Sequence, residues 1–242
     1  MSSGSDIREA FGAAIPIMLG YAAIGIPCGI LSASIGMNVW QVLIMCVLFY
    51  SGAGQFMIPN MWLAGSPIAS IVLSVSLVNT RQMLYSASFA PRCRNVGRPL
   101  AFLFAATVTD ESFGVNSARF EAGEWTVKKA TLVNLCSQSS WTAFNVVGVL
   151  VGSAIPIPLA VASFAMTAIF ICLVVVQKIT PETICAIITA FVGVYVVKLL
   201  GLGGFAIVAG ALLGVASALV LSRVRKAKPA RRNGPDVQAG SA

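Results

Sequence analysis

The chain contains no histidine, and only 10% of its 242 residues are charged. The absence of histidine removes the side chain that most often binds metals and transfers protons near neutral pH. Soluble domains carry about 25% charged residues, whereas here hydrophobic residues make up 57% and the mean hydropathy is +0.88. This composition indicates an integral membrane protein, and the length allows roughly six to eight spans.

Sequence motifs of enzymes and cofactor sites are also absent. There is no P-loop for ATP, no dinucleotide fingerprint, no G-x-S-x-G elbow and no metal-ligand spacing. None of the six cysteines belongs to a C-x-x-C pair and five lie in apolar stretches, so we expect them to act as small buried hydrophobes. We therefore predict a protein that is not an enzyme and that holds no cofactor and no metal.

The basic residues are concentrated near one end of the chain. The formal net charge is +8, and six of the sixteen Lys and Arg residues lie between Arg223 and Arg232, beyond the last apolar stretch. A basic segment beside a membrane span indicates the cytosolic side and contact with anionic lipid. No nucleic-acid partner is implied.

Eight apolar stretches follow one another, at residues 13–35, 39–63, 67–89, 100–116, 130–155, 158–176, 181–200 and 204–221. We predict an all-α integral membrane protein, a bundle of about seven or eight transmembrane or re-entrant helices with broken helices in the first half. Residues 1–222 are expected to form a single transmembrane transporter domain, and residues 223–242 a disordered basic C-terminal tail.

The positions of the basic residues constrain the topology. Arg92, Arg94 and Arg98 place the loop after the third stretch in the cytosol, and the basic tail does the same for the C-terminus. Five stretches lie between these landmarks, and an odd number of complete spans cannot connect two points on one side. One stretch is therefore expected to be re-entrant, and the short, interrupted stretch 100–116 is the best candidate.

Arg81 lies near the middle of the third stretch, about midway between Pro67 and Pro91. At roughly 1.5 Å of helical rise per residue, both prolines are about 15–20 Å away, which puts the arginine near the centre of a hydrocarbon core about 30 Å thick. An arginine at that depth costs at least about 2.5–3.5 kcal/mol unless it is paired or hydrated. Such a residue indicates a polar path or a binding site.

Three polar interruptions are candidates for that site. In the second stretch, the glycines and the polar neighbour of Ser51-Gly52-Ala53-Gly54-Gln55 can unwind a membrane helix, and the freed backbone groups then need partners. Close helix packing is the alternative explanation. In the third stretch, Asn79-Thr80-Arg81-Gln82 is expected to break the helix near the membrane midplane. We predict that Gly52, Gly54, Gln55, Asn79 and Arg81 bind substrate.

The third interruption is the pair Asp110 and Glu111 in the fourth stretch. Two adjacent carboxylates at depth cannot both be ionised at low cost. One of them could pair with Arg81 while the other takes up and releases a proton, and we predict an ion-coupling role for both. The alternative places them among lipid headgroups, with Asn116 and Arg119 leading out to water.

Small residues also recur at helical spacing. Gly25-x-x-x-Gly29, Gly148-x-x-x-Gly152 and Gly210-x-x-x-Gly214 are expected to be faces where helices pack closely.

The segments Tyr50–Phe56, Val78–Tyr85 and Thr109–Phe113 together resemble motifs of the AzlC family, the large subunits of bacterial branched-chain amino-acid exporters, in their order and spacing. The resemblance spans about residues 8 to 222. It implies export of valine, leucine and isoleucine, with methionine as a further candidate, driven by an ion gradient across the inner membrane. It also implies a separately encoded small membrane subunit of the AzlD type. Ser51 departs from the alanine expected in many relatives.

The residues and the resemblance lead to one hypothesis, a secondary exporter subunit whose breaks at Gly52–Gly54 and Asn79–Arg81 face one another. The substrate carboxylate would bind either to helix N-termini or to Arg81, and its ammonium to unwound carbonyls. Two alternatives remain open. One is a passive pore or channel for a small solute, and the other is a membrane scaffold that only stabilises a partner subunit.

Overall fold

The computed structural model describes residues 3–123, 125–155, 179–201 and 206–226, with a few separate positions between 158 and 175. These residues form helices and contain no strand. The sixth apolar stretch, at residues 158–176, lies largely outside the described residues, as does the predicted tail beyond Lys226. The chain divides into two compact units, Met1–Cys172 and Leu173–Ala242.

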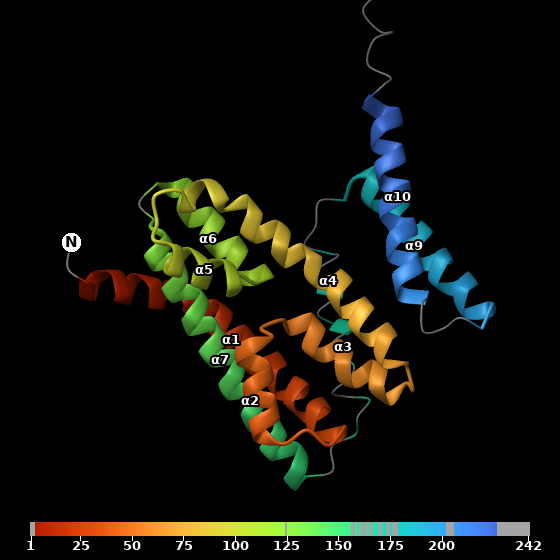
Figure 1. Ribbon diagram of the computed structural model, residues 1–242, viewed down its shortest axis with the longest axis horizontal. Helices are drawn as coiled ribbons and strands as arrows, with labels where there is room; N and C mark the ends of the chain where they lie inside the picture. Colours follow the sequence, from red (N-terminus) through yellow and green to blue (C-terminus); the bar gives the residue numbers. More distant parts are fainter. Residues whose placement is uncertain are drawn as a thin grey trace, which may run out of the picture. The chain divides into compact units, whose positions relative to one another are not determined.

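The first unit is built on two long helices, α1 (Ser3–Ser34) and α7 (Val127–Ala154), which pack against each other along much of their length (Figure 1). The glycine faces predicted from the sequence lie in this contact. A Cβ on Gly29 would approach the Asn145 carbonyl oxygen to 2.0 Å, and one on Gly148 would approach the Ile26 carbonyl oxygen to 2.2 Å. The two backbones therefore touch where only glycine fits.

Two pairs of short helices replace single spans in the first unit. α2 (Val39–Leu48) and α3 (Gly52–Leu63) divide the second apolar stretch, and α5 (Arg98–Ala106) and α6 (Asp110–Ala122) divide the fourth. With nine residues, α5 is about 14 Å long, half of the hydrocarbon thickness. The sequence prediction that these two stretches are interrupted is confirmed, whereas complete or re-entrant crossing remains a prediction.

Polar side chains start these short helices. Asn38 and Gln41 form a capping box at the start of α2, and Thr109 and Ser112 do so at the start of α6. The Ser51 hydroxyl accepts a hydrogen bond from the Gly54 amide and caps α3. Because each cap satisfies amides at a helix start, the chain can restart a helix inside an apolar stretch.

The prediction that the third stretch breaks at Asn79 is wrong. α4 (Ile68–Ser88) is continuous through the polar run and is followed by the 3-10 helix η1 (Ala90–Cys93). None of the four polar residues disrupts helical backbone bonds, because the side chains of Asn79, Arg81 and Gln82 bond to residues on other elements. The Thr80 hydroxyl bonds within its own helix, to the Leu77 carbonyl.

An ion cluster joins the starts of α1 and α7. The Lys129 side chain is 4% exposed, and its Nζ lies 2.6 Å from Glu9 Oε2 and 3.5 Å from Asp6 Oδ1. Trp125 packs beneath the Lys129 ammonium and donates a hydrogen bond to Asn116, which in turn donates to Asn134. The buried polar groups of this cluster therefore have partners, as interiors require.

The second unit contains α9 (Pro181–Leu199) and α10 (Ala206–Lys226), which pack together. Gly210 and Gly214 lie against α9 so closely that a Cβ would approach the carbonyl oxygens of Ala190 and Ala186 to 2.9 Å, which confirms the third predicted packing face. Arg225 pairs with Glu182 at 3.0 Å. α10 continues to Lys226, so its last turn includes the first residues of the basic segment.

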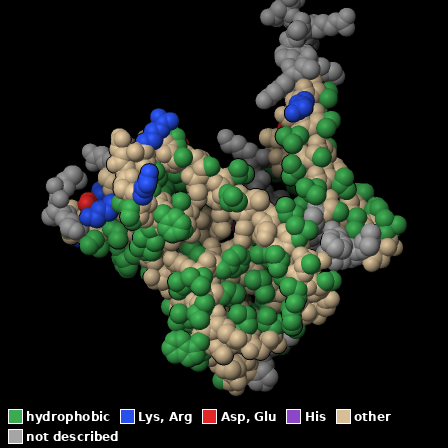
Figure 2. Space-filling model, in the orientation of Figure 1, with side chains coloured by type: hydrophobic (Ala, Val, Ile, Leu, Met, Phe, Trp, Pro, Cys, Tyr) green, Lys and Arg blue, Asp and Glu red, His purple; other side chains and the backbone are tan. Residues whose placement is uncertain are grey.

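The surface fits a membrane protein. Within the part of the chain that the structure describes, two helical segments, Gly4–Ser34 and Pro181–Leu199, are long and apolar enough to cross a membrane. Large exposed hydrophobic side chains cover most of the described helices, and Figure 2 shows them over the first unit, whose Lys and Arg on this face lie near α5 and α6. An apolar exterior with charge at one end is what contact with lipid requires.

Candidate functional site

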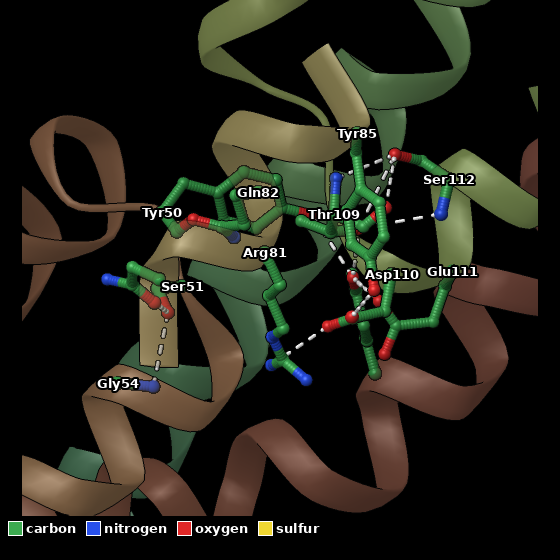
Figure 3. Close-up of polar contacts among 12 residues, drawn as sticks. Tyr50, Ser51, Gly54, Arg81, Gln82, Tyr85, Thr109, Asp110, Glu111 and Ser112 are labelled. Carbon is green, nitrogen blue, oxygen red and sulfur yellow. Dashed lines mark hydrogen bonds and ion pairs between the residues drawn. The ribbon is translucent and has the colours of Figure 1, made fainter. Parts of the chain in front are cut away.

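Three segments from separate parts of the first unit meet at the candidate site (Figure 3). They are the break between α2 and α3, the middle of α4 and the first turn of α6. Hydrogen bonds and one ion pair connect α4 to both of the other segments. The site therefore combines all three polar interruptions of the sequence.

The α2–α3 break spans residues 49–51, just before the two glycines. Gly52 and Gly54 belong to the first turn of α3 and are not unwound. A Cβ on Gly54 would lie 2.8 Å from Ser51 Oγ and 2.9 Å from the Phe49 ring, whereas one on Gly52 would make an ordinary 3.6 Å contact with Trp141. Gly54 is thus needed so that the cap and the Phe49 ring can pack over the start of α3.

The Gln55 side chain connects the α2–α3 break to the interior of the first unit. The side chain is fully buried, its Nε2 donates to the Phe49 carbonyl at 2.6 Å, and its Oε1 accepts from the Trp141 indole at 2.8 Å. The Cys46 thiol also donates to Oε1, at 3.4 Å. Since both ends of the amide are engaged by protein groups, the geometry favours a positioning role for Gln55 over the predicted direct contact with substrate.

Replacing Gln55 with leucine should lower stability. The change leaves the buried Trp141 N–H unpaired and removes one of the two hydrogen bonds that the Phe49 carbonyl accepts, which costs about 2 kcal/mol. Thermal unfolding of the purified protein in detergent measures the effect as a lower midpoint temperature. Ser139→Ala is the matched control, because that exposed hydroxyl bonds only to the Leu135 carbonyl of its own helix. Equal midpoints for the two variants would contradict the bracing role.

Arg81 pairs with Asp110, as the sequence suggested. Arg81 Nη2 lies 2.9 Å from Asp110 Oδ2, and the two side chains are 25% and 18% exposed. The Tyr85 hydroxyl donates to the other carboxylate oxygen at 2.7 Å. In the part of the chain that the structure describes, the buried Nε of Arg81 has no hydrogen-bond partner. The pair is therefore held by one guanidinium nitrogen, and Arg81 keeps donors for a further group.

The first turn of α6 carries both carboxylates. Acidic side chains are favoured there because the amides of the first helical turn are partly positive. Glu111 accepts a hydrogen bond from the buried Tyr21 hydroxyl at 2.8 Å, so the two adjacent carboxylates have separate partners. The alternative that places both at lipid headgroups does not account for the internal partners that each one has.

Asn79 and Gln82 connect α4 to the break. Ser51 Oγ donates to Asn79 Oδ1 at 2.6 Å, and Gln82 Nε2 donates to the Tyr50 carbonyl at 3.2 Å. Ser51 therefore both caps α3 and joins it to α4, which gives the departure from alanine a structural role. The Phe49 and Tyr50 carbonyls are also engaged, so the unwound carbonyls predicted to receive the substrate ammonium already have partners.

An open hollow with a volume of about 520 Å³ lies beside this contact. Its α4 side is largely polar and its α5 side is apolar. The lining residues are Ser76, Asn79, Gln82, Met83, Ser86, Phe102, Ala105, Ala106 and Val108. A space with one polar and one apolar wall suits a small amphipathic molecule.

Sequence reasoning found the charged members of the site and missed the tyrosines. Tyr21, Tyr50 and Tyr85 all direct hydroxyl groups to the site, and Tyr21 lies about ninety positions before its partner Glu111. A tyrosine inside a long apolar helix was the available signal. Among the described residues there is no group of three or more potential metal ligands.

One family model and several known membrane proteins match this chain. The model of the family described as AzlC protein matches residues 16–155. An uncharacterized membrane protein of Helicobacter pylori (strain ATCC 700392 / 26695) is 33% identical over 172 residues, which cover 70% of this chain and 75% of the relative. No solved structure matches the chain.

Two relatives with informative names cover more of the chain. The branched-chain amino acid transport protein AzlC of Bacillus subtilis (strain 168) is 28% identical over 222 residues, 89% of this chain and 85% of the relative. The inner membrane protein YgaZ of Escherichia coli (strain K12) is 26% identical over 216 residues, 85% and 86% of the two chains. The family match contains all three motifs of the site and confirms the resemblance noted in the sequence. The chain therefore belongs to the AzlC family and is a membrane protein with a role in transport.

Proposed function

We propose that the chain is the large membrane subunit of a secondary exporter of branched-chain amino acids, with Arg81 as the group that binds the substrate carboxylate. Valine, leucine and isoleucine are the proposed substrates, with methionine as a further one. The proposal also includes the bacterial inner membrane as location, a cytosolic C-terminus and a small partner subunit of the AzlD type. The family and the name of the Bacillus subtilis relative support the substrate class.

The observation that carries the proposal is the incomplete pairing of Arg81. A guanidinium offers five N–H donors, and here one nitrogen engages Asp110 while the buried Nε has no partner among the described residues. Buried donors without partners are rare and need a reason. A carboxylate is the natural ligand for such a group, because it accepts two parallel hydrogen bonds from a guanidinium.

A zwitterion suits the Arg81–Asp110 pair as a whole. Its carboxylate can bind Arg81 while its ammonium binds a carboxylate of α6, so each charge in the membrane keeps a counter-charge when substrate enters. The carbonyls of the α2–α3 break already accept hydrogen bonds from Gln55 and Gln82. We therefore assign the ammonium to the carboxylates in place of those carbonyls.

The hollow between α4 and α5 accommodates the apolar side chain of the substrate in this proposal. A branched apolar side chain needs only an apolar surface, which the α5 side of the hollow provides. The volume of about 520 Å³ falls within the range of small-molecule sites. Asn79 and Gln82 line the hollow, and they lie just before and just after Arg81 in the chain. The proposed site thus combines the charged pair with an adjoining apolar surface.

Reconstitution separates the proposed exporter from its alternatives. The chain, together with the small membrane subunit encoded beside it, is placed in liposomes loaded with radiolabelled leucine. The exporter predicts saturable leucine efflux that competing valine and isoleucine reduce and that depends on an imposed ion gradient. Flux that persists unchanged after an ionophore collapses the gradient indicates a passive pore. An absence of flux, with normal assembly of the partner, indicates a scaffold.

Enlarging Ala105 should alter substrate preference. Ala105→Leu narrows the apolar wall of the hollow, so leucine transport is expected to fall by about tenfold relative to valine transport, as one methylene in a tight apolar pocket allows. Initial rates for the two substrates in the same liposomes give the ratio. Ala118→Leu, on an exposed position of α6, is the control and should leave it unchanged. An unchanged ratio for Ala105→Leu would remove the hollow from the proposed site.

A further inference from the structure

The two adjacent carboxylates of α6 are held in different ways. Asp110 has a cation and a hydroxyl as partners, since Arg81 binds one of its oxygens and Tyr85 the other. Glu111 is an exposed residue, and its one hydrogen-bond partner among the described side chains is the Tyr21 hydroxyl, at 2.8 Å. Protonating Asp110 would break an ion pair, whereas protonating Glu111 would disturb one hydrogen bond. The two residues are therefore suited to different tasks.

Tyr21 has two acceptors for one proton. Its buried hydroxyl lies 2.8 Å from Glu111 Oε2 and 3.0 Å from Thr109 Oγ1. Its oxygen also accepts a hydrogen bond from the Tyr50 hydroxyl at 3.3 Å. Because a phenol carries only one hydrogen, Tyr21 can donate fully to one of these two oxygens at a time. The ionised Glu111 is the stronger acceptor, because hydrogen bonds to charged groups are the stronger ones.

We infer that Glu111 is the carboxylate that takes up and releases the coupling ion, a proton, and that Tyr21 transmits its charge state by moving its hydrogen bond between Glu111 and Thr109. The inference rests on the proposed function and assigns one step of it to named groups. Asp110 remains ionised as the fixed counter-charge of Arg81. Thr109 caps α6, so the switch acts at the helix start that carries both carboxylates.

The proton step involves no other chemical change. A proton from water binds to Glu111 Oε2, and the side chain changes from a charge of −1 to neutral. The Tyr21 hydroxyl then rotates to donate to Thr109 Oγ1, while the Tyr50 hydroxyl continues to donate to the Tyr21 oxygen. Release of the proton from Glu111 reverses the sequence. No hydroxyl loses its own proton at any point.

Other charged or titratable groups surround Glu111 on several elements. They are Tyr21 on α1, Tyr50 ahead of α3, Arg81 and Tyr85 on α4, and Asp110 beside it on α6. Arg81 is the one cation in this set, and Asp110 engages it directly. Protonation of Glu111 therefore changes the net charge around an already paired Arg81, which couples the proton to the group proposed to bind substrate.

Infrared difference spectroscopy tests the assignment without any transport. A pH step applied to the parent protein in lipid nanodiscs should produce a carboxylic-acid C=O band that disappears in Glu111→Gln and persists in Glu121→Gln, an exposed glutamate of the same helix. In Tyr21→Phe the band's pH midpoint should rise by about 1 pH unit, because the ionised form loses a donor. A band that survives in Glu111→Gln would overturn the inference.

Gradient-driven transport provides the second measurement. A proton carried across one pH unit supports about tenfold accumulation of substrate, and this accumulation should be lost in Glu111→Gln and retained in Glu121→Gln. Tyr21→Phe should shift the pH profile of transport to higher pH, the same direction as the shift of the infrared band. Parent-level accumulation in Glu111→Gln overturns the inference while leaving the proposed exporter intact. A parent protein that moves no branched-chain amino acid overturns the proposed function and this coupling role with it.

Discussion

Arg81→Ala is expected to lower leucine efflux by at least about 30-fold, because loss of one partner of a desolvated charge pair costs about 2–5 kcal/mol. The change removes the proposed ligand of the substrate carboxylate. It also removes the cation that pairs with Asp110, which keeps the hydrogen bond from the Tyr85 hydroxyl at 2.7 Å. Initial efflux rates from liposomes, normalised to the amount of inserted protein, measure the effect. Arg81→Lys should recover little activity, because an ammonium cannot bind a carboxylate with two parallel bonds.

Neutralising both partners separates function from stability. Arg81→Gln and Asp110→Asn each leave one unpaired charge, so each is expected to reduce the amount of folded protein. The double variant has no unpaired charge, and we expect its abundance to return toward the parent level while efflux stays lost. Parent-like efflux in the double variant would show that the pair is only an interhelical contact, as the scaffold alternative requires.

A second ion pair in the chain provides the matched control. Arg225 and Glu182 join α10 to α9 at 3.0 Å, a distance close to that of the Arg81–Asp110 pair, but the Arg225 side chain is 54% exposed. Exposed pairs contribute little to stability. Arg225→Gln with Glu182→Gln should therefore leave both abundance and efflux near the parent values. Comparable losses in this control would point to a general sensitivity to charge removal.

The pairing of Arg81 could be predicted from the sequence because a charged side chain inside a membrane needs a counter-charge or a polar partner. A guanidinium at that depth needs a carboxylate, and Asp110 and Glu111 are the acidic residues of the neighbouring apolar stretch. The interruptions at residues 49–51 and 107–109 follow the same logic, since glycine and capping residues mark places where helices can restart. Local rules therefore predicted which segments meet at the candidate site.

The remaining features depend on contacts between distant parts of the chain. α4 stays helical through Asn79–Gln82 because Ser51, Tyr50 and Asp110 supply partners from other elements. Gln55 is satisfied by Trp141, and Glu111 by Tyr21, across separations of 86 and 90 residues. No local pattern specifies such pairs. The sequence alone could therefore identify the polar residues of the candidate site. It could not distinguish residues that position the helices from residues that face a ligand.

The close contact of α1 with α7 is where a single methyl group should have the largest effect on stability. A Cβ at Gly29 would lie 2.0 Å from the Asn145 carbonyl oxygen and 2.8 Å from the Gly148 Cα, both of them backbone atoms. Backbone cannot rotate away as a side chain can, so the two helices must separate. Overpacking of this kind costs about 3 kcal/mol, and the α1–α7 contact holds Tyr21 beside Trp141, with ring centroids 5.1 Å apart.

Gly29→Ala should therefore lower the thermal midpoint of the protein in detergent, and Gly148→Ala should do the same from the opposite helix. Gly20→Ala is the control on α1, because a Cβ there meets no atom within 4 Å. Alanine is favoured over glycine inside a helix by about 1 kcal/mol, so this control should leave the midpoint unchanged or raise it. Equal midpoints for Gly29→Ala and Gly20→Ala would mean that the helices are not in backbone contact. Because the same contact positions Tyr21, the destabilised variants should also lose the pH dependence assigned to Glu111.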